Sequence, residues 1–167
     1  MKIFLIGMPG AGKSTLGRQL AGALALPFYD LDKEIEKREG RTIPEIFGQS
    51  GEDHFRLIES TLLREFAGKG SSFVLATGGG APCFFGNMET LKSSGLTIYL
   101  KVPITTLLQR LRNSKNRPLL ETDQDRETRL TSLLETRQLV YEQAALIISN
   151  PDVSKVIDAI HRSGVNR

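Results

Sequence analysis

The sequence lacks the features that mark a secreted, membrane-spanning or nucleic-acid-binding protein. Cys83 is the only cysteine, so no internal disulfide can form, and we expect an unreactive thiol and a reducing, cytoplasmic location. No apolar run approaches the about 20 residues of a membrane-spanning helix. The two histidines, His54 and His161, have no metal-ligand spacing. Basic residues are not clustered with stacking aromatic residues, which argues against a nucleic-acid partner.

The composition is otherwise that of an ordinary soluble domain. The chain has 167 residues, 40% of them hydrophobic and 25% charged, which predicts one domain over residues 1–167. The net charge of +3 fits an anionic small molecule and is too small to indicate nucleic acid. A strand-like run leads from residue 2 directly into a glycine-rich loop, so we expect no signal peptide.

The most informative segment is residues 7–14, which read GMPGAGKS and match the phosphate-binding P-loop G-x-x-x-x-G-K-[ST]. An apolar run over residues 3–6 precedes the loop, and leucines spaced by four come after it, which indicates a strand, a turn and a helix. The loop's N–H groups and the helix N-terminus would face an anion. Lys13 would reach the β- and γ-phosphates, and Ser14 would offer its hydroxyl to Mg²⁺.

Strand-like and helical patterns alternate along the rest of the chain. The strands are expected at 2–6, 27–29, 72–76, 96–102 and 146–149, and the helices at 13–25, 31–39, 52–67, 103–111, 124–144 and 153–162. This alternation predicts an α/β fold in which helices cover both faces of a parallel sheet. Thr42 with Glu45 predicts a capping box that opens a short helix, and Gly40 is typical of a helix C-terminus.

Residues 112–122 are polar and basic and show no periodicity, which predicts a loop. A loop of this length is uncommon in a compact domain and is usually functional or disordered. Beside a P-loop, such a segment is typical of a lid over phosphates. Arg117 within it is a candidate for a built-in arginine finger on the transferring phosphoryl group.

The residues at the ends of the predicted strands narrow the reaction. Neither an N-K-x-D tetrapeptide nor a D-x-x-G switch is present, which argues against a GTPase. The run 72–76 leads through Thr77 to Gly78, Gly79 and Gly80, three residues that allow a ligand to approach the backbone closely. No aspartate follows the run 72–76, so a carboxylate for the metal must come from elsewhere in the chain. Asp30 and Asp32 come after a short strand, and extended alternation would put both on one face, one to hold Mg²⁺ through water and one to accept a hydroxyl proton.

Arg56 has two interpretations from the residues alone. Glu52 and Glu59 stand at helical neighbour spacing, which slightly favours a surface ion pair of small energetic weight. The alternative is a guanidinium fork for a substrate carboxylate, oriented by Glu59. Arg137, on a long predicted helix, would by itself be read as solvated.

Taken together, these motifs resemble the shikimate kinase family. The resemblance rests on pieces that occur in the family's order and spacing across about residues 3 to 151: the P-loop continuing to Arg18, Phe28–Asp32, Ile46-Phe47, Gly51-Glu52 with Phe55-Arg56 and Glu59, Thr77–Gly80, Arg117–Leu120, and Arg137 with Tyr141 and Ala145.

The resemblance implies a P-loop NTPase fold with a five-stranded parallel sheet in the order 2-3-1-4-5, helices on both faces, a substrate-binding region at 33–61 and a lid at 112–122. It implies ATP- and Mg²⁺-dependent phosphorylation of the 3-hydroxyl of shikimate, on the path to chorismate and aromatic amino acids, by a monomer. The implied catalytic residues are Lys13, Asp32 and Arg117. Shikimate would meet Asp32, Arg56, Gly78, Gly79, Gly80, Arg137, Phe47, Phe55 and Leu119. ATP would meet Gly10, Ala11, Gly12, Lys13, Ser14, Thr15, Arg110, Arg117 and Pro151, and the metal Ser14 and Asp30.

Two other functions stay open at this point. A related kinase for gluconate or a nucleoside monophosphate would share the P-loop, although Arg56 and Arg137 favour an acceptor with a carboxylate. A non-catalytic nucleotide-binding regulator should have lost Lys13, Asp32 or Arg117, and all three are present.

Overall fold

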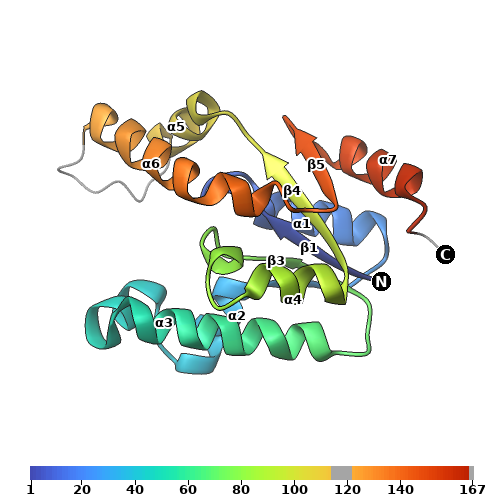
Figure 1. The fold of residues 1–167 in the computed structure, drawn as a ribbon, viewed down its shortest axis with the longest axis horizontal. Coiled ribbons are helices and arrows are strands. Elements are labelled where there is room, and N and C mark those ends of the chain that lie inside the picture. The colour runs from blue at the N-terminus through green and yellow to red at the C-terminus, as the bar shows by residue number, and fades with distance from the viewer. Residues whose placement is uncertain (114–121, 166–167) are drawn as a thin grey trace.

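The computed structural model describes residues 1–113 and 122–165 and shows a five-stranded parallel sheet with helices on both faces (Figure 1). The strands are β1 (Lys2–Ile6), β2 (Phe28–Asp30), β3 (Phe73–Ala76), β4 (Leu96–Lys101) and β5 (Leu146–Ser149), in the order β2-β3-β1-β4-β5. The helices are α1 (Lys13–Ala23), α2 (Leu31–Glu39), α3 (Ile43–Gly68), α4 (Asn87–Ser94), α5 (Ile104–Arg112), α6 (Asp123–Tyr141) and α7 (Val153–Ser163). The predicted fold class and sheet order are confirmed.

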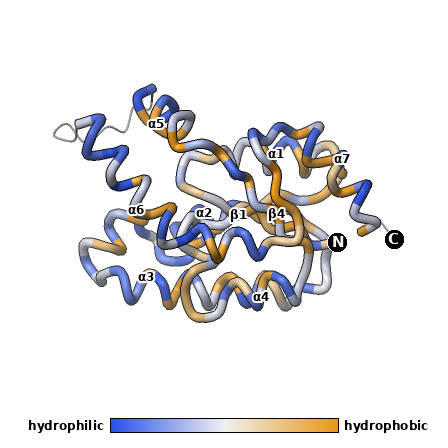
Figure 2. Tube along the Cα trace, turned by 45° about the horizontal axis from the view of Figure 1, so that its top comes forward, coloured by the Kyte–Doolittle hydropathy of each residue, from blue (hydrophilic) through white to orange (hydrophobic). Residues whose placement is uncertain are grey.

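The central strands are apolar on both faces because both faces are covered. Residues 3–6 of β1 and 73–75 of β3 have no exposed surface. Helices α1 and α7 lie over one face of the sheet, and α3 and α4 lie over the other (Figure 1). Hydrophobic residues gather along β1 and β4, whereas α6 is mostly hydrophilic (Figure 2). Burial of these runs on both sides explains why they lack the alternation of a half-exposed strand.

Helix α3 joins the predicted short helix and the predicted helix 52–67 in one element. It begins at Ile43, behind the expected capping box of Thr42 and Glu45, and continues to Gly68. A kink at Gly51, with φ of 83° and ψ of 170°, separates the predicted short helix from the predicted helix 52–67. Gly40 ends α2 with φ of 64°, as expected from its position.

Residues 81–95 contain two elements that the sequence pattern did not indicate. A 3-10 turn over Ala81–Cys83, labelled η1, and helix α4 come after the three glycines. Asn87, at the start of α4, has no exposed surface. Its amide Nδ2 donates to the Ala81 carbonyl at 2.9 Å, and its Oδ1 accepts from the Ser60 hydroxyl at 2.7 Å. This asparagine therefore anchors the segment after the glycines to α3.

Residues 114–121 of the predicted lid lie outside the described residues. Arg117 and Leu119 are among them. Helices α5 and α6, which come before and after this segment in the sequence, pack against each other at one end of the molecule (Figure 1). Thr122 and Asp125 form a second capping box at the start of α6. Among the residues that the structure describes, no helix has the length and apolar character to cross a membrane.

Candidate functional site

The site lies where the carboxyl ends of β1, β2 and β3 meet, as expected for an open parallel sheet. Each strand leads directly into one predicted motif: the P-loop, the aspartate pair and the three glycines. The three motifs line a cavity of about 400 Å³. Its walls are Pro9, Gly10, Gly12, Lys13, Ser14, Thr15, Asp30, Asp32, Thr77, Gly78 and Gly79.

The P-loop has the backbone that close approach to phosphate requires. Gly10 and Gly12 adopt φ of 81° and 87°, values that favour glycine. Lys13 Nζ donates to the carbonyl oxygens of Gly7 and Met8, each at 2.8 Å. Burial lowers the pKa of Lys13 to about 8, against the opposing charge of Asp32. An anion placed beside this ammonium would favour its charged form.

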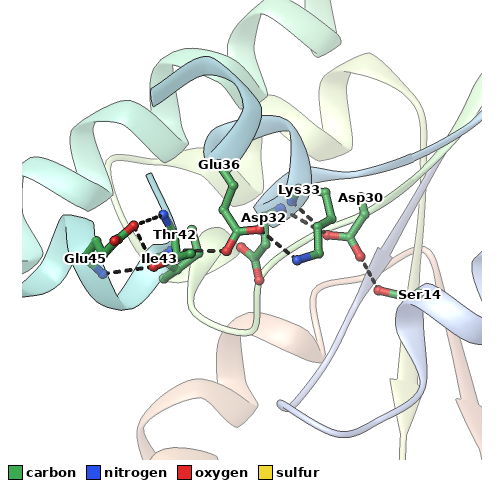
Figure 3. A network of polar contacts seen from close by, with 8 residues as sticks. All are labelled: Ser14, Asp30, Asp32, Lys33, Glu36, Thr42, Ile43 and Glu45. Carbon is green, nitrogen blue, oxygen red and sulfur yellow. Dashed lines mark hydrogen bonds and ion pairs between the residues drawn. The ribbon is translucent and has the colours of Figure 1, made fainter. Parts of the chain in front are cut away.

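Asp30 and Asp32 both line this cavity, but not through extended alternation as predicted. Helix α2 begins at Leu31, so Asp32 lies in its first turn. Asp30 is the N-cap, because its Oδ1 accepts from the backbone N–H groups of Asp32 and Lys33 at 3.1 and 3.3 Å. Its other oxygen, Oδ2, accepts from the Ser14 hydroxyl (Figure 3). The cap turns the chain so that the two carboxylates still reach one space.

The Ser14 and Asp30 oxygens fit a small hard cation. Mg²⁺ takes oxygen ligands and keeps several waters, so one or two protein groups beside a phosphate site suffice. Within residues 1–113 and 122–165, no group of three or more His, Cys, Asp or Glu side chains forms a separate metal cage. Their position in the P-loop cavity makes Ser14 and Asp30 candidate ligands for a metal there.

A second, smaller cavity of about 170 Å³ adjoins the first. The two cavities share Pro9, Asp32, Gly78 and Gly79. The structure thus gathers the described part of the predicted acceptor site from α2, α3, the glycine loop (residues 78–81) and α6. The other residues that line this cavity are Ile43, Phe47, Phe55, Arg56, Glu59, Gly80 and Arg137.

Arg56 is buried, so its interpretation as a surface ion pair was wrong. Arg56 is 8% exposed and Glu59 1%, and Arg56 Nη1 lies 2.8 Å from Glu59 Oε1. The guanidinium carbon also lies 4.3 Å from the ring centroid of Phe84. Glu52, in contrast, is exposed and 3.4 Å away. The spacing of charges along α3 does not distinguish these two glutamates, because burial decides which one matters.

Two carboxylates with raised pKa values, those of Asp32 and Glu59, lie next to Gly78. Burial raises the pKa of Asp32, and the charge of Asp30 adds to this. Burial also raises the pKa of Glu59, while hydrogen bonding to Arg56 opposes the shift. Glu59 Oε2 is buried and has no hydrogen-bond partner among the described residues. A carboxyl with a raised pKa in a cleft is typical of a group that moves a proton.

The three glycines are needed for contacts within the protein as well as for ligand approach. A Cβ on Gly78 would lie 2.9 Å from Glu59 Oε2 and 3.0 Å from Asp32 Oδ1. On Gly79 it would lie 2.8 Å from Pro9 Cδ, and on Gly80 it would lie 2.5 Å from Arg56 Nη2. Any side chain here would displace a group that lines one of the two cavities.

A third cavity, of about 560 Å³, lies against the P-loop and the first turns of α1. Arg110 of α5 and Pro151 before α7 both line it, together with Thr15 and Ala11. Arg110 Nη1 donates to the Gly10 carbonyl at 2.9 Å. The predicted ATP-binding residues that the structure describes therefore all line one of the two cavities that border the P-loop. The position of adenine stays a prediction.

Sequence reasoning gave no role to four residues at this site. Pro9 and Ile43 line the second cavity, and Phe84 stacks on Arg56. Tyr141, quoted only as part of a motif, donates from its hydroxyl to the Gly79 carbonyl at 2.6 Å. A spacing of four residues from Arg137 on one helix is the pattern that could have indicated a shared face.

A P-loop cavity that adjoins a pocket lined by two arginines and two carboxylates is typical of a kinase of small molecules. A family model described as shikimate kinase matches residues 9–162. The chain belongs to the shikimate kinase family.

Individual relatives agree with the family model. A shikimate kinase from Thioalkalivibrio sulfidiphilus is 47% identical over 163 residues, which are 96% of this chain and 85% of that protein. The structure of a shikimate kinase from Acinetobacter baumannii in complex with shikimate is 40% identical, with a TM-score of 0.86 over 99% of this chain and 95% of that one. A shikimate kinase from Bacteroides thetaiotaomicron has a TM-score of 0.87 at 38% identity, over 98% and 96%. A gluconokinase from Sinorhizobium meliloti, 16% identical with a TM-score of 0.63, shares the fold alone.

Proposed function

We propose that the protein transfers the γ-phosphoryl group of ATP to the 3-hydroxyl of shikimate and releases shikimate 3-phosphate and ADP. This reaction would serve the pathway to chorismate and the aromatic amino acids. The observation that supports it most directly is the shared wall of the two cavities, where Asp32, Gly78 and Gly79 face both the P-loop and the arginine pair. Family membership and the relative in complex with shikimate support the choice of acceptor.

Arg56 and Arg137 are the proposed carboxylate clamp. Arg56 is held by Glu59 at 2.8 Å, so its guanidinium is oriented before any ligand arrives. Preorganised cations lose less entropy when they bind an anion than free side chains do. Phe47 and Phe55 lie with ring centroids 4.7 Å apart and would wall the acceptor ring, with Leu119 assigned from the sequence.

Asp32 is the proposed proton acceptor for the 3-hydroxyl. It lies between the clamp and the P-loop, which is where the attacking oxygen must sit for in-line transfer. Its raised pKa matches it better to a hydroxyl proton than an ordinary, fully solvated aspartate. Holding the hydroxyl and the phosphoryl group in this geometry supplies much of the acceleration in such reactions.

The P-loop and Lys13 would bind the phosphates and oppose their developing charge. Arg110 and Pro151 are proposed to hold adenine, and Arg117, outside the described residues, is proposed from the sequence as the arginine that completes the site. Ser14 and Asp30 are proposed to hold Mg²⁺, which supplies charge neutralisation at the β- and γ-phosphates when bound.

The remaining proposals concern organisation and location. We infer one domain over residues 1–167, with a substrate-binding region at 33–61 and a lid at 112–122. The protein is proposed to act as a cytoplasmic monomer on small molecules, without a nucleic-acid or membrane partner.

Competition between acceptors tests the proposal. Release of ADP from ATP and Mg²⁺ is measured with shikimate, gluconate and nucleoside monophosphates, supplied singly and then together. We expect ADP release with shikimate and with neither of the other acceptors. Gluconate and nucleoside monophosphates should not slow the reaction with shikimate. Faster turnover with gluconate or a nucleotide, or binding of ATP without transfer to any of the three, would contradict the proposal.

A further inference from the structure

The glycine loop of the acceptor site is held at two backbone carbonyls by buried side chains from different elements. Asn87 of α4 donates to the Ala81 carbonyl at 2.9 Å. Tyr141 of α6 donates to the Gly79 carbonyl at 2.6 Å. The asparagine holds the far end of the loop, whereas the tyrosine holds the glycine that lines both cavities.

Tyr141 is built to keep that hydroxyl in one place. The residue has no exposed surface, and its ring lies 5.1 Å from the ring of Tyr99, tilted by 35°. Burial raises the pKa of Tyr141 above its ordinary value, against the opposing charge of Arg137 and a hydrogen bond with its side chain, so the hydroxyl stays protonated and donates at any working pH. A buried tyrosine normally directs its hydroxyl to a partner, and here the partner is a residue of the site.

Gly79 is the point where three parts of the site touch. A Cβ there would meet Pro9 of the P-loop at 2.8 Å and Arg137 Nη1 at 3.2 Å. Its carbonyl and the N–H of Gly80 belong to one planar trans peptide, so fixing one direction fixes the other. A small rotation of this peptide would therefore move the glycine loop relative to both Pro9 of the P-loop and Arg137 of the proposed carboxylate clamp.

Helix α6 carries Arg137 and Tyr141 one turn apart. Residues four apart lie on the same face, so both side chains reach the glycine loop from one rigid element. The hydrogen bond to Gly79 thus fixes the distance between the loop and the helix that supplies half of the clamp.

We propose that the Tyr141 hydroxyl is a positioning group for the acceptor: through the Gly79 carbonyl it sets the glycine loop against Arg137 and so determines affinity for the substrate carboxylate. The inference rests on the proposed function, because it assigns the acceptor to this cavity. Tyr141 does not itself line either cavity, so it acts through Gly79 and Arg137.

The test is Tyr141→Phe, which keeps the ring and removes the hydroxyl. We expect the KM for shikimate to rise about tenfold, since a buried carbonyl is left without its donor. The KM for ATP should stay within about twofold of the wild-type value, because Tyr141 lines neither of the cavities that the P-loop borders. Tyr99→Phe is the matched control: it removes a hydroxyl from the other ring of the stack and should leave the KM for shikimate unchanged.

A second measurement separates positioning from packing. Arg137→Lys should raise the KM for shikimate and leave the KM for ATP unchanged. In the double variant with Tyr141→Phe, the rise in the KM for shikimate should be clearly smaller than the product of the two single rises, because both substitutions act on one contact. Folding of each variant is checked by its melting temperature, and the assays are run below the lowest one.

Three results would overturn the inference. The KM for shikimate could stay within twofold in Tyr141→Phe, Tyr99→Phe could raise it equally, or the two effects with Arg137→Lys could multiply. Wild-type turnover of shikimate is measured first. Its absence contradicts the proposed function and the inference with it, whereas normal wild-type turnover with an unaffected Tyr141→Phe contradicts the inference alone.

Discussion

Glu59 shows how strongly one buried residue can govern a site. It holds Arg56 at 2.8 Å through one oxygen, while the other lies beside Gly78 without a hydrogen-bond partner among the described residues. Removing one partner of a buried ion pair leaves an uncompensated charge in a poorly solvated place. Glu52 contacts the same guanidinium from an exposed position and offers a direct comparison.

We expect Glu59→Ala to lower the free energy of unfolding by about 3 kcal/mol, the loss typical of a broken buried pair. Glu52→Ala should lower it by less than about 1 kcal/mol, because that pair is screened by water. Urea unfolding of both variants measures the two values. Equal losses would mean that Arg56 does not depend on Glu59 in particular.

Asp32 is the residue on which the proposed chemistry depends. Asp32→Asn keeps the size of the side chain but cannot accept a proton, so turnover should fall by about 10² to 10⁴. Affinity for ATP should stay nearly unchanged, because the substitution leaves the P-loop, Lys13 and the Ser14–Asp30 hydrogen bond in place. Steady-state kinetics with a separate nucleotide-binding titration measures both. Near-normal turnover would remove Asp32 from the proposed role.

At the scale of elements, the sequence predicted the features that local patterns encode. The strands are predicted by apolar runs such as residues 3–6, and the start of α3 by the reciprocal bonds of Thr42 and Glu45. Helix α4 was missed because its only strongly buried apolar residues are Met88 and Leu91, too few for a clear helical period. Its anchor, Asn87, is polar and is buried only because Ser60 and the Ala81 carbonyl lie beside it.

The candidate site divides in the same way. The P-loop could be predicted from its spacing, because phosphate binding there needs glycine for the backbone, the lysine ammonium for the phosphate charge and the serine hydroxyl for the metal. The burial of Arg56 could not, since an i, i+3 pair with glutamate looks the same on a surface as in a core. Tyr141 bonds to a residue 62 positions away, and only the folded chain brings the two together.

The kink in α3 separates the helical turn that carries Phe47 from the turn that carries Phe55 and Arg56. Gly51 has φ of 83° and ψ of 170°. A Cβ at this position would have no neighbouring atom within 4 Å, so a substitution tests the backbone alone.

We expect Gly51→Ala to cost about 1 to 3 kcal/mol, since this backbone region is essentially restricted to glycine. Gly48→Ala is the control, because Gly48 also has open space around it but lies within the helix at an ordinary φ. It should be neutral or stabilising by up to about 1 kcal/mol. Thermal and urea unfolding give both values, and similar effects of the two substitutions would rule out the proposed restraint at Gly51.

At the scale of the whole molecule, three segments far apart in the chain build one site because parallel strands bring their carboxyl ends to one edge. The P-loop comes after β1, the aspartates lie at the end of β2 and the glycines come after β3, and these strands are neighbours in the sheet. Helix α6 adds Arg137 from the last third of the chain. The reaction proposed for this protein depends on the two cavities acting as one.

The most direct test of that claim is to identify the product by phosphorus and proton NMR after incubation of the wild-type protein with ATP, Mg²⁺ and shikimate. The account predicts a single new phosphate ester whose phosphorus couples to the proton on carbon 3 of shikimate, formed in equal amount to ADP. Phosphate on another hydroxyl, or ADP formed with inorganic phosphate and no ester, would contradict it.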